Sequence, residues 1–553
     1  MNKKNKNPQI THLDKKEKST KEKKDLLDRL DNFFQSKSKI LLWISLVASL
    51  LLSFLLFNVR VSEGGDDSAY ILRAFEFIKE LKFPSFQGPL YPLVLSFFVW
   101  IFGINVFVLK FLSIIFILIH LYFFYKAFNN RIPSFISTST LLIIACNAAL
   151  LYYASQTYNE AFFLMLQALF FYFFFRYILD QNENISIKNY IILGLLVFLI
   201  GITKTIGFSV LIVVLIFLLV YKNWKGAIIT LVSFIGFYLI LEIIKRSFFG
   251  EQAAQFNSQL STLLQVDPYD ASKGLENFKG YINRFWGNSN LYLSKHLYNF
   301  LGLKSDIVKT SAFITISTYV LFLVSFIVTF RKNKYLAFTG IYLITMCGAT
   351  FITLQTRWDQ ERLILVYLPL ILIFIFSGLY FLAKQKMFKT LQIILPLLIL
   401  IIFLTNLKVT LKKVKENDDL LMNSLSGNKF YGMTPDWINY IKMSEWAAEN
   451  VPDSVNIACR KPSISFIYGK RNFYGVYRIP STDPDTLLNI LKTNKVHYFI
   501  MGSLRRNPKQ KTEHTINTEQ RYLYYLSQKY PQKIKLVHTI GVDESAYLFE
   551  IIY

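Results

Sequence analysis

Long apolar runs recur through roughly the first 400 residues of the chain. A helix needs roughly 17 to 25 mostly apolar residues to cross a hydrocarbon layer of about 30 Å, and eleven runs are good candidates for such a helix. They lie at 40–58, 106–125, 135–152, 161–179, 189–203, 205–221, 226–244, 309–330, 335–353, 363–383 and 390–406. This pattern predicts an all-α polytopic domain with about eleven transmembrane helices.

A twelfth apolar run, at 89–103, is short and opens with Pro-Leu-Tyr-Pro, which is typical of an interfacial or re-entrant helix. If this run does not cross, several basic loops fall on the side of the basic N-terminal tail, as the positive-inside tendency favours. These loops are 126–131, 222–225, 331–334 and 384–389. We therefore expect a cytoplasmic N-terminus, with the loops 59–105 and 245–308 facing outward.

From about Leu407 the composition becomes that of a soluble domain. Helix-like and strand-like patterns alternate there, which predicts a small α/β domain outside the membrane. The helix-like segments are 436–450, 485–493 and 517–529, and the strand-like segments are 455–460, 473–476, 496–501 and 535–540. The expected organisation is a basic cytoplasmic tail at 1–39, a transmembrane domain at 40–406 and an extracytoplasmic α/β domain at 407–553.

Composition agrees with a membrane protein. Hydrophobic residues make up 53% of the 553 residues and charged residues only 18%, so most of the chain faces lipid. The net charge of +25 is concentrated in the tail and at the ends of apolar runs, where membrane topology explains it, so no nucleic-acid partner is expected. The three cysteines are far apart and form no metal-binding or disulfide pattern.

Two consecutive acids follow the first apolar run, in Ser62-Glu63-Gly64-Gly65-Asp66-Asp67-Ser68-Ala69-Tyr70. The two glycines allow a tight turn, and an Asp at this place can cap the helix-like segment 71–82. A cap explains one Asp but not two. Acids at a membrane surface are costly unless they are hydrated, paired or functional.

Further motifs follow in a fixed order along residues 40–405. They are Gly88-Pro89-Leu90-Tyr91-Pro92, Phe102-Gly103, Gly201-Ile202-Thr203-Lys204, and Arg357 to Arg362 followed by Tyr367-Leu368-Pro369. Together with Asp66-Asp67-Ser68-Ala69-Tyr70, this order resembles the GT-C membrane glycosyltransferases related to protein O-mannosyltransferases and to the aminoarabinose transferase of lipid A. The chain departs from many relatives at Gln87-Gly88-Pro89, where they carry Lys or His before two prolines.

The resemblance implies transfer of a hexosyl or pentosyl group from a polyprenyl-phosphate donor to a protein, lipid A or glycan acceptor of the cell envelope. It assigns Asp66 as the base that activates the acceptor, with Asp67 as the neighbouring acid. The phosphate leaving group needs cations, for which Lys204, Arg357 and Arg362 are candidates, or a divalent metal ion. Glu160 and Tyr70 are candidates for acceptor or metal binding.

Simpler explanations exist for each of these residues. The cations can snorkel to the interface, and Glu160 can be an acid favoured at a helix start. A transporter or flippase would place ionisable residues within the spans of two pseudo-symmetric halves, and a non-catalytic component of polysaccharide assembly would need neither Asp66 nor Asp67. We expect a multi-pass enzyme in a bacterial cytoplasmic membrane, with the sugar and the acceptor left open.

Overall fold

The computed structural model describes residues 25–84, 88–181, 185–250, 263–267, 273–303, 309–505 and 516–553. Most of the predicted tail and parts of the loop 245–308 lie outside these residues.

Within the described ranges, seven helices are long and apolar enough to cross a membrane. They are α1 (Leu26–Leu55), α4 (Val106–Phe128), α7 (Asn159–Phe174) continued by η1 (Phe175–Leu179), α10 (Trp224–Phe249), α14 (Ala312–Phe330), α15 (Lys334–Thr353) and α18 (Leu391–Leu425). An eighth candidate is broken into α5 (Ser134–Ala145) and α6 (Ala148–Ala154), which meet at a bend of 57°.

Shorter apolar helices account for the remaining predicted runs. These are α8 (Ile187–Thr203), η2 (Thr205–Phe208) joined to α9 (Ser209–Val220), and α17 (Leu368–Ala383). Each of the eleven predicted runs is therefore helical. The short run at 89–103 forms α3 (Leu90–Phe102). Its 13 residues rise about 20 Å, which is less than the thickness of the hydrocarbon layer.

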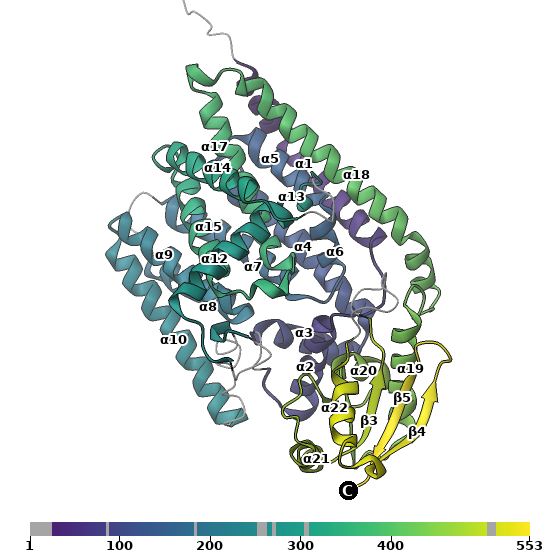
Figure 1. Ribbon diagram of the computed structural model, residues 1–553. Helices are drawn as coiled ribbons and strands as arrows, with labels where there is room; N and C mark the ends of the chain where they lie inside the picture. Colours follow the sequence, from purple (N-terminus) through teal and green to yellow (C-terminus); the bar gives the residue numbers. More distant parts are fainter. Residues whose placement is uncertain are drawn as a thin grey trace, which may run out of the picture.

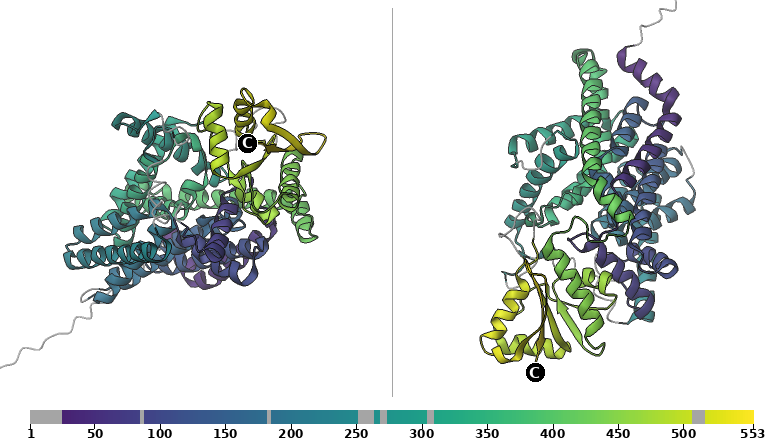
Figure 2. Two further views of the ribbon diagram at one scale, coloured as in Figure 1. Left: turned by 90° about the horizontal axis from the view of Figure 1, so that it is seen from below. Right: turned by 90° about the vertical axis from the view of Figure 1, so that its right-hand side faces the viewer.

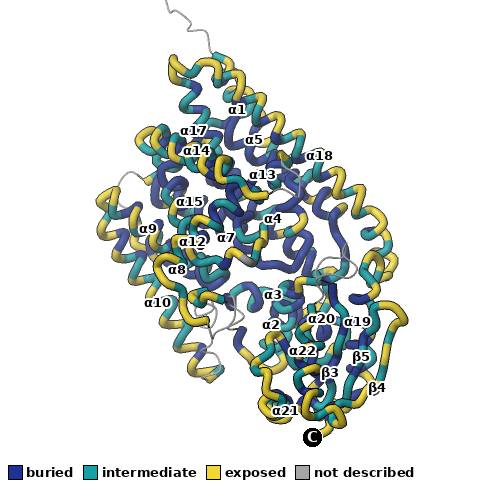
Figure 3. Tube along the Cα trace, in the orientation of Figure 1, coloured by how far each residue is buried: buried dark blue, intermediate teal, exposed yellow. Residues whose placement is uncertain are grey.

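Residues at the centre of the bundle are buried, whereas the outer helices expose apolar side chains. Figure 3 shows α4, α5 and α7 mostly buried, whereas α1, α10 and α18 carry exposed positions on their outer faces. Large apolar side chains such as Trp43, Ile235 and Leu397 are exposed there. Such a surface is stable against lipid and not against water, so the chain is a multi-pass membrane protein.

A five-stranded sheet forms the C-terminal part of the chain, in the order β2-β1-β3-β5-β4. Its strands are β1 (Asn456–Cys459), β2 (Tyr474–Gly475), β3 (Val496–Gly502), β4 (Ile534–Ile540) and β5 (Ala546–Ile551). β1 pairs in parallel with β2 and β3, while β5 is antiparallel to β3 and β4. The helices are α19 (Pro435–Asn450), α20 (Pro462–Gly469), α21 (Pro484–Thr493) and α22 (Thr518–Ser527), with a short η8 (Pro531–Lys533). The predicted α/β organisation is confirmed, although α20 and β5 were not foreseen.

The sheet region lies at one end of the bundle, and α18 runs from the bundle toward it (Figures 1 and 2). Helix α2 (Asp66–Glu80) lies between the two parts and contacts α20. Short elements form part of the loop 245–308 and of other connections between the apolar helices: α12 (Phe278–Leu291), η5 (Tyr292–His296), α13 (Leu297–Phe300), η6 (Thr356–Trp358), α16 (Arg362–Leu365) and η7 (Lys386–Phe388).

Candidate functional site

The turn before α2 places the two consecutive acids in the first turn of that helix. Gly65 has φ +86°, a left-handed conformation that glycine adopts without strain, and it is the N-cap residue. Its amide donates to the Ser62 carbonyl oxygen at 3.0 Å, which closes the turn. The helix therefore begins at Asp66, earlier than the predicted segment 71–82.

Asp67 is buried and holds this turn together. Its Oδ2 accepts from the Ser62 amide at 2.7 Å, and its Oδ1 accepts from the Ser68 amide at 2.8 Å and the Ser62 hydroxyl at 3.1 Å. Burial raises the pKa of the Asp67 carboxyl, while the Ser62 amide and the charge of Lys110 act in the opposite direction. With three donors on its two oxygens, Asp67 has the geometry of a structural acid.

Asp66 lies beside it with about a third of its side chain exposed and forms an ion pair with Arg362. The guanidinium of Arg362 also lies 3.9 Å from Glu160 Oε1 and 4.9 Å from the centre of the Tyr158 ring. Burial alone would lower the pKa of Arg362, but the carboxylates of Glu160 and Asp66 outweigh it and hold the pKa well above its usual value. Arg362 therefore carries a permanent positive charge between two acids.

Glu160 extends the network into the bundle. It lies in the first turn of α7 and is almost fully buried, and its Oε1 accepts from Lys204 Nζ at 2.9 Å. Its second oxygen, Oε2, is buried and has no hydrogen-bond partner among the residues that the structure describes. Asp66, Arg362, Glu160 and Lys204 thus form a continuous chain of alternating charges, which we call the charge network.

A break between two helices positions Lys204. Lys204 ends α8 in an extended conformation before η2 begins. Gly88, at φ +94°, approaches this break so closely that a Cβ atom there would lie 2.5 Å from the carbonyl oxygen of Thr203. The Asn159 side-chain amide donates to the same oxygen at 3.3 Å. The starts of α3 and α7 therefore meet the end of α8 at Lys204.

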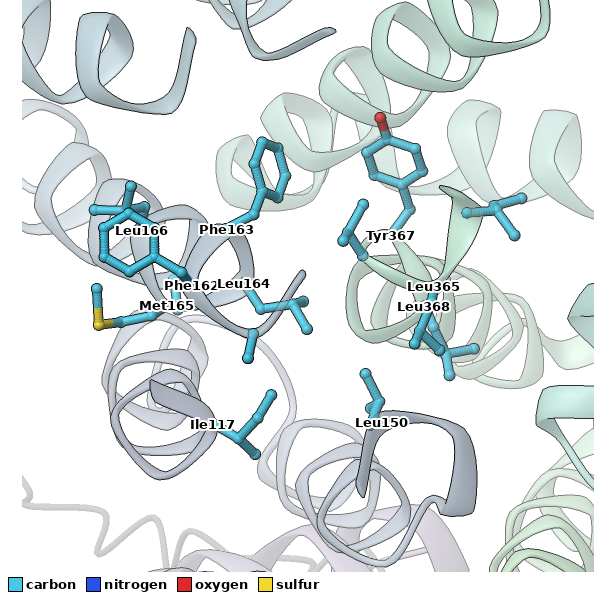
Figure 4. Close-up of a cluster of buried hydrophobic side chains, with 14 of the residues drawn as sticks. Ile117, Leu150, Phe162, Phe163, Leu164, Met165, Leu166, Leu365, Tyr367 and Leu368 are labelled. Carbon is cyan, nitrogen blue, oxygen red and sulfur yellow. The ribbon is translucent and has the colours of Figure 1, made fainter. Parts of the chain in front are cut away.

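Helix α16, which begins at Arg362, packs against α6 and α13, and α6 in turn packs against α7, whose first turn carries Glu160. Figure 4 shows Leu365, Tyr367 and Leu368 in one cluster of buried side chains with Phe163 and Leu164 of α7.

The segment before α16 is fixed by a second group of charges. Asp359 adopts φ +39° and accepts from Lys295 Nζ and pairs with His296 Nε2, both at 2.7 Å. Burial lowers the pKa of His296, although the Asp359 carboxylate opposes this. These contacts tie the loop that contains η5 to the segment that supplies Arg362.

Tyr70 is buried beneath the charge network. Its ring lies edge-on to that of Tyr91, with 5.2 Å between the centroids. Burial raises the pKa of the Tyr70 hydroxyl, and the charges of Glu160 and Asp66 raise it further. The structure thus brings Asp66, Lys204, Arg362, Glu160 and Tyr70 together, whereas the side chain of Arg357 lies outside the described part of the chain.

The donor set of this network does not fit a resident metal ion. No group of three or more His, Cys, Asp or Glu side chains that could hold a metal occurs in the described ranges. The exposed acid Asp66 is paired with Arg362, and Glu160 already accepts from Lys204. Guanidinium and ammonium groups occupy the places where a divalent cation would neutralise these acids.

Several residues at the site had no role there predicted from the sequence. The Tyr158 hydroxyl lies 2.5 Å from the Ser62 hydroxyl, and Lys461 of the C-terminal region reaches the same turn. Lys110 is buried in α4 and donates to Asn58 Oδ1 at 2.9 Å and to the Arg60 carbonyl oxygen at 2.7 Å. A lysine inside an apolar run is a signal that could have identified Lys110.

No protein family matches the chain, and no curated protein matches its sequence. Among solved structures, ArnT from Cupriavidus metallidurans bound to undecaprenyl phosphate matches with a TM-score of 0.54 and 10% identity, over 93% of this chain and 98% of that one. The apo form of the same protein matches with a TM-score of 0.52 and 11% identity, over 92% and 97% of the two chains. The oligosaccharyltransferase AglB from Archaeoglobus fulgidus matches more weakly, with a TM-score of 0.48, 11% identity, and 92% and 74% coverage.

The ArnT matches show the fold: the chain has the GT-C fold, as its resemblance to that group of membrane glycosyltransferases implied. This confirms the expected architecture of a polytopic helical domain followed by a small α/β region.

Proposed function

We propose that this protein is a membrane glycosyltransferase that moves a sugar from a polyprenyl-phosphate donor to a cell-envelope acceptor. The observation that carries the proposal is the charge network: a partly exposed acid, Asp66, lies beside fixed cations at one end of the bundle, next to the C-terminal sheet region. ArnT, which has the same fold, binds undecaprenyl phosphate, and this supports a donor of that class.

Asp66 acts as the general base. An acceptor hydroxyl is a weak nucleophile until a carboxylate within hydrogen-bond reach takes its proton. The hydroxyl oxygen then bonds to the anomeric carbon of the sugar as the bond from that carbon to the phosphate oxygen breaks, so the configuration inverts. Asp66 is suited to this step because its carboxylate is partly exposed and lies beside Arg362. Asp67, with both oxygens engaged, shapes the turn instead.

Arg362 and Lys204 stabilise the leaving phosphate. Charge grows on the phosphate oxygen as the bond to the sugar breaks, and fixed cations in a partly buried site stabilise that charge strongly. Both side chains are about 15% exposed, so each keeps access to a ligand while the protein screens it from bulk water. Arginine has five N–H donors, so Arg362 can hold Asp66 and a phosphate at the same time.

The acceptor reaches Asp66 from the side of the C-terminal region. We place the N-terminus in the cytoplasm and the C-terminal domain outside a bacterial cytoplasmic membrane, because the basic connections then lie inside. The acids of the first outward loop consequently face the compartment in which cell-envelope acceptors occur. The acceptor is a protein, lipid A or a glycan of the envelope, and the group transferred is a hexosyl or pentosyl group.

The test is transfer of radiolabelled sugar from a panel of polyprenyl-phosphate donors to envelope acceptors, in membranes with matched amounts of each variant. Asp66→Asn removes the base and is expected to reduce transfer by about 100-fold to 10,000-fold. Glu80→Gln, the same kind of change at an acid of the same helix that lies outside the charge network, is the matched control and is expected to transfer at the wild-type rate. Equal transfer by wild type and Asp66→Asn would refute the assignment.

A further inference from the structure

The C-terminal region does more than lie beside the charge network, because one of its lysines reaches into the turn that carries Asp66. Lys461 Nζ donates to the carbonyl oxygen of Glu63 at 2.8 Å and to that of Gly64 at 3.0 Å. These two carbonyl groups immediately precede Gly65 and Asp66. A single ammonium group therefore fixes the backbone at the point where the chain turns into α2.

A serine completes the contact from the start of α20. The Ser463 hydroxyl donates to the Gly65 carbonyl oxygen at 3.2 Å and lies 3.0 Å from the hydroxyl of Ser68. Three consecutive carbonyl groups, those of Glu63, Gly64 and Gly65, are thus held by two side chains almost 400 positions later in the sequence. We call Lys461 and Ser463 the clamp.

The rest of the C-terminal region holds Lys461 in place. Its backbone amide donates to the Tyr440 hydroxyl at 3.0 Å, and its ammonium lies 5.7 Å from the centre of the Trp437 ring. Trp437 and Tyr440 are both fully buried in α19. Burial lowers the pKa of Lys461 to about 8, the charge of Arg460 adds to this, and Asp66 and Glu63 oppose it. Lys461 is therefore directed by its own domain toward the turn and is not a surface lysine that happens to touch it.

We propose that the clamp positions the catalytic base: Lys461 and Ser463 of the C-terminal region hold the 62–66 turn so that Asp66 faces the acceptor. This inference rests on the proposed glycosyltransferase function for its kinetic consequence, but the clamp itself can be tested without activity. Lys461 is a positioning residue, because its ammonium contacts the main chain of the turn and not the reacting atoms.

The experiment combines hydrogen exchange with kinetics on the full-length protein in detergent. Lys461→Met removes the ammonium at similar length, Lys461→Arg keeps the charge and donors, and Lys442→Met changes an exposed lysine of α19 as the control. Ser463→Ala removes the second part of the clamp with a smaller change. Amide exchange of peptides covering residues 61–70 reports the order of the turn, and transfer kinetics report kcat and the KM for the donor.

The clamp predicts faster exchange of the turn in Lys461→Met and Ser463→Ala, with wild-type exchange in Lys442→Met. Misplacing the base is expected to lower kcat about 10-fold to 100-fold with little change in the donor KM, and Lys461→Arg is expected to recover most of that loss. Faster exchange with unchanged kcat, or a lower kcat with unchanged exchange, would overturn the positioning role.

The two proposals fail in different ways. If wild type transfers no sugar from any donor, the proposed function fails, while the exchange data still decide whether the clamp orders the turn. If wild type transfers sugar and Lys461→Met matches it in both measurements, the clamp is refuted and the proposed function stands.

Discussion

Replacing Asp67 by Asn tests whether the second acid is structural. An amide oxygen can take the place of Oδ1 and accept from the Ser68 amide and the Ser62 hydroxyl. The amide nitrogen then faces the Ser62 amide, which in the wild type donates to Oδ2 at 2.7 Å, so two donors meet. Losing a hydrogen bond to a charged group costs about 1.5 to 3 kcal/mol.

The buried ammonium of Lys110 also loses a nearby negative charge. Removing one partner of a buried pair costs up to about 3 to 5 kcal/mol, but Lys110 keeps its bonds to Asn58 and to the Arg60 carbonyl oxygen, so only part of this is expected. The total loss of stability for Asp67→Asn is therefore about 3 kcal/mol.

The assay is unfolding of the purified protein in one detergent, followed by intrinsic fluorescence, with Glu80→Gln as the control. We expect Asp67→Asn to unfold several degrees below wild type, and the added change Lys110→Met to recover part of the loss because it removes the unpaired charge. If Asp67→Asn unfolds like wild type yet transfers no sugar, the structural role is wrong and Asp67 belongs to the chemistry.

Three further predictions concern substitutions of single residues. Burial raises the pKa of Glu519 from 4.5 to about 8, so its stabilising contribution is complete below pH 4.5 and is lost as the pH rises through about 8. Glu519→Gln should therefore match wild type at pH 4.5 and be more stable at pH 9, by on the order of 5 kcal/mol, and equal unfolding temperatures at pH 9 would contradict this. Gly88→Ala places a Cβ against the Thr203 carbonyl group at a positive φ and should lower stability by about 1 to 3 kcal/mol, whereas an unchanged unfolding temperature would show that the close approach is absent. Lys204→Met leaves buried Glu160 with the more distant Arg362 and should cost about 3 kcal/mol and raise the donor KM; an unaltered KM would remove Lys204 from the phosphate site.

The membrane helices could be predicted because a crossing helix needs a long apolar run. Each such run can be identified from its own residues, without knowledge of the rest of the chain. Most of the C-terminal elements could be predicted for a similar reason, from local alternation of apolar and polar positions. Helix α20 could not, since its eight residues carry no amphipathic pattern long enough to distinguish them from a loop. Yet α20 contributes Ser463, which contacts the turn before Asp66.

Which groups meet at the site depends on long-range packing that no local pattern encodes. Asp66 and Arg362 are 296 positions apart in the sequence, and their pairing depends on long-range contacts such as the packing of α16 against α6 and α13. Nothing in the local sequence distinguishes the role of Asp66 from that of Asp67. Only the fold separates them, because the turn directs one carboxylate toward three internal donors and the other toward Arg362.

The most direct test of the central claim measures donor binding and transfer in the same preparation of purified Asp66→Asn protein. If Asp66 is the base, the variant binds the polyprenyl-phosphate donor within about threefold of wild type, while single-turnover transfer falls at least about 100-fold. If transfer continues at the wild-type rate, or falls only as far as donor binding falls, Asp66 is not the base and the account of the charge network as a catalytic site is contradicted.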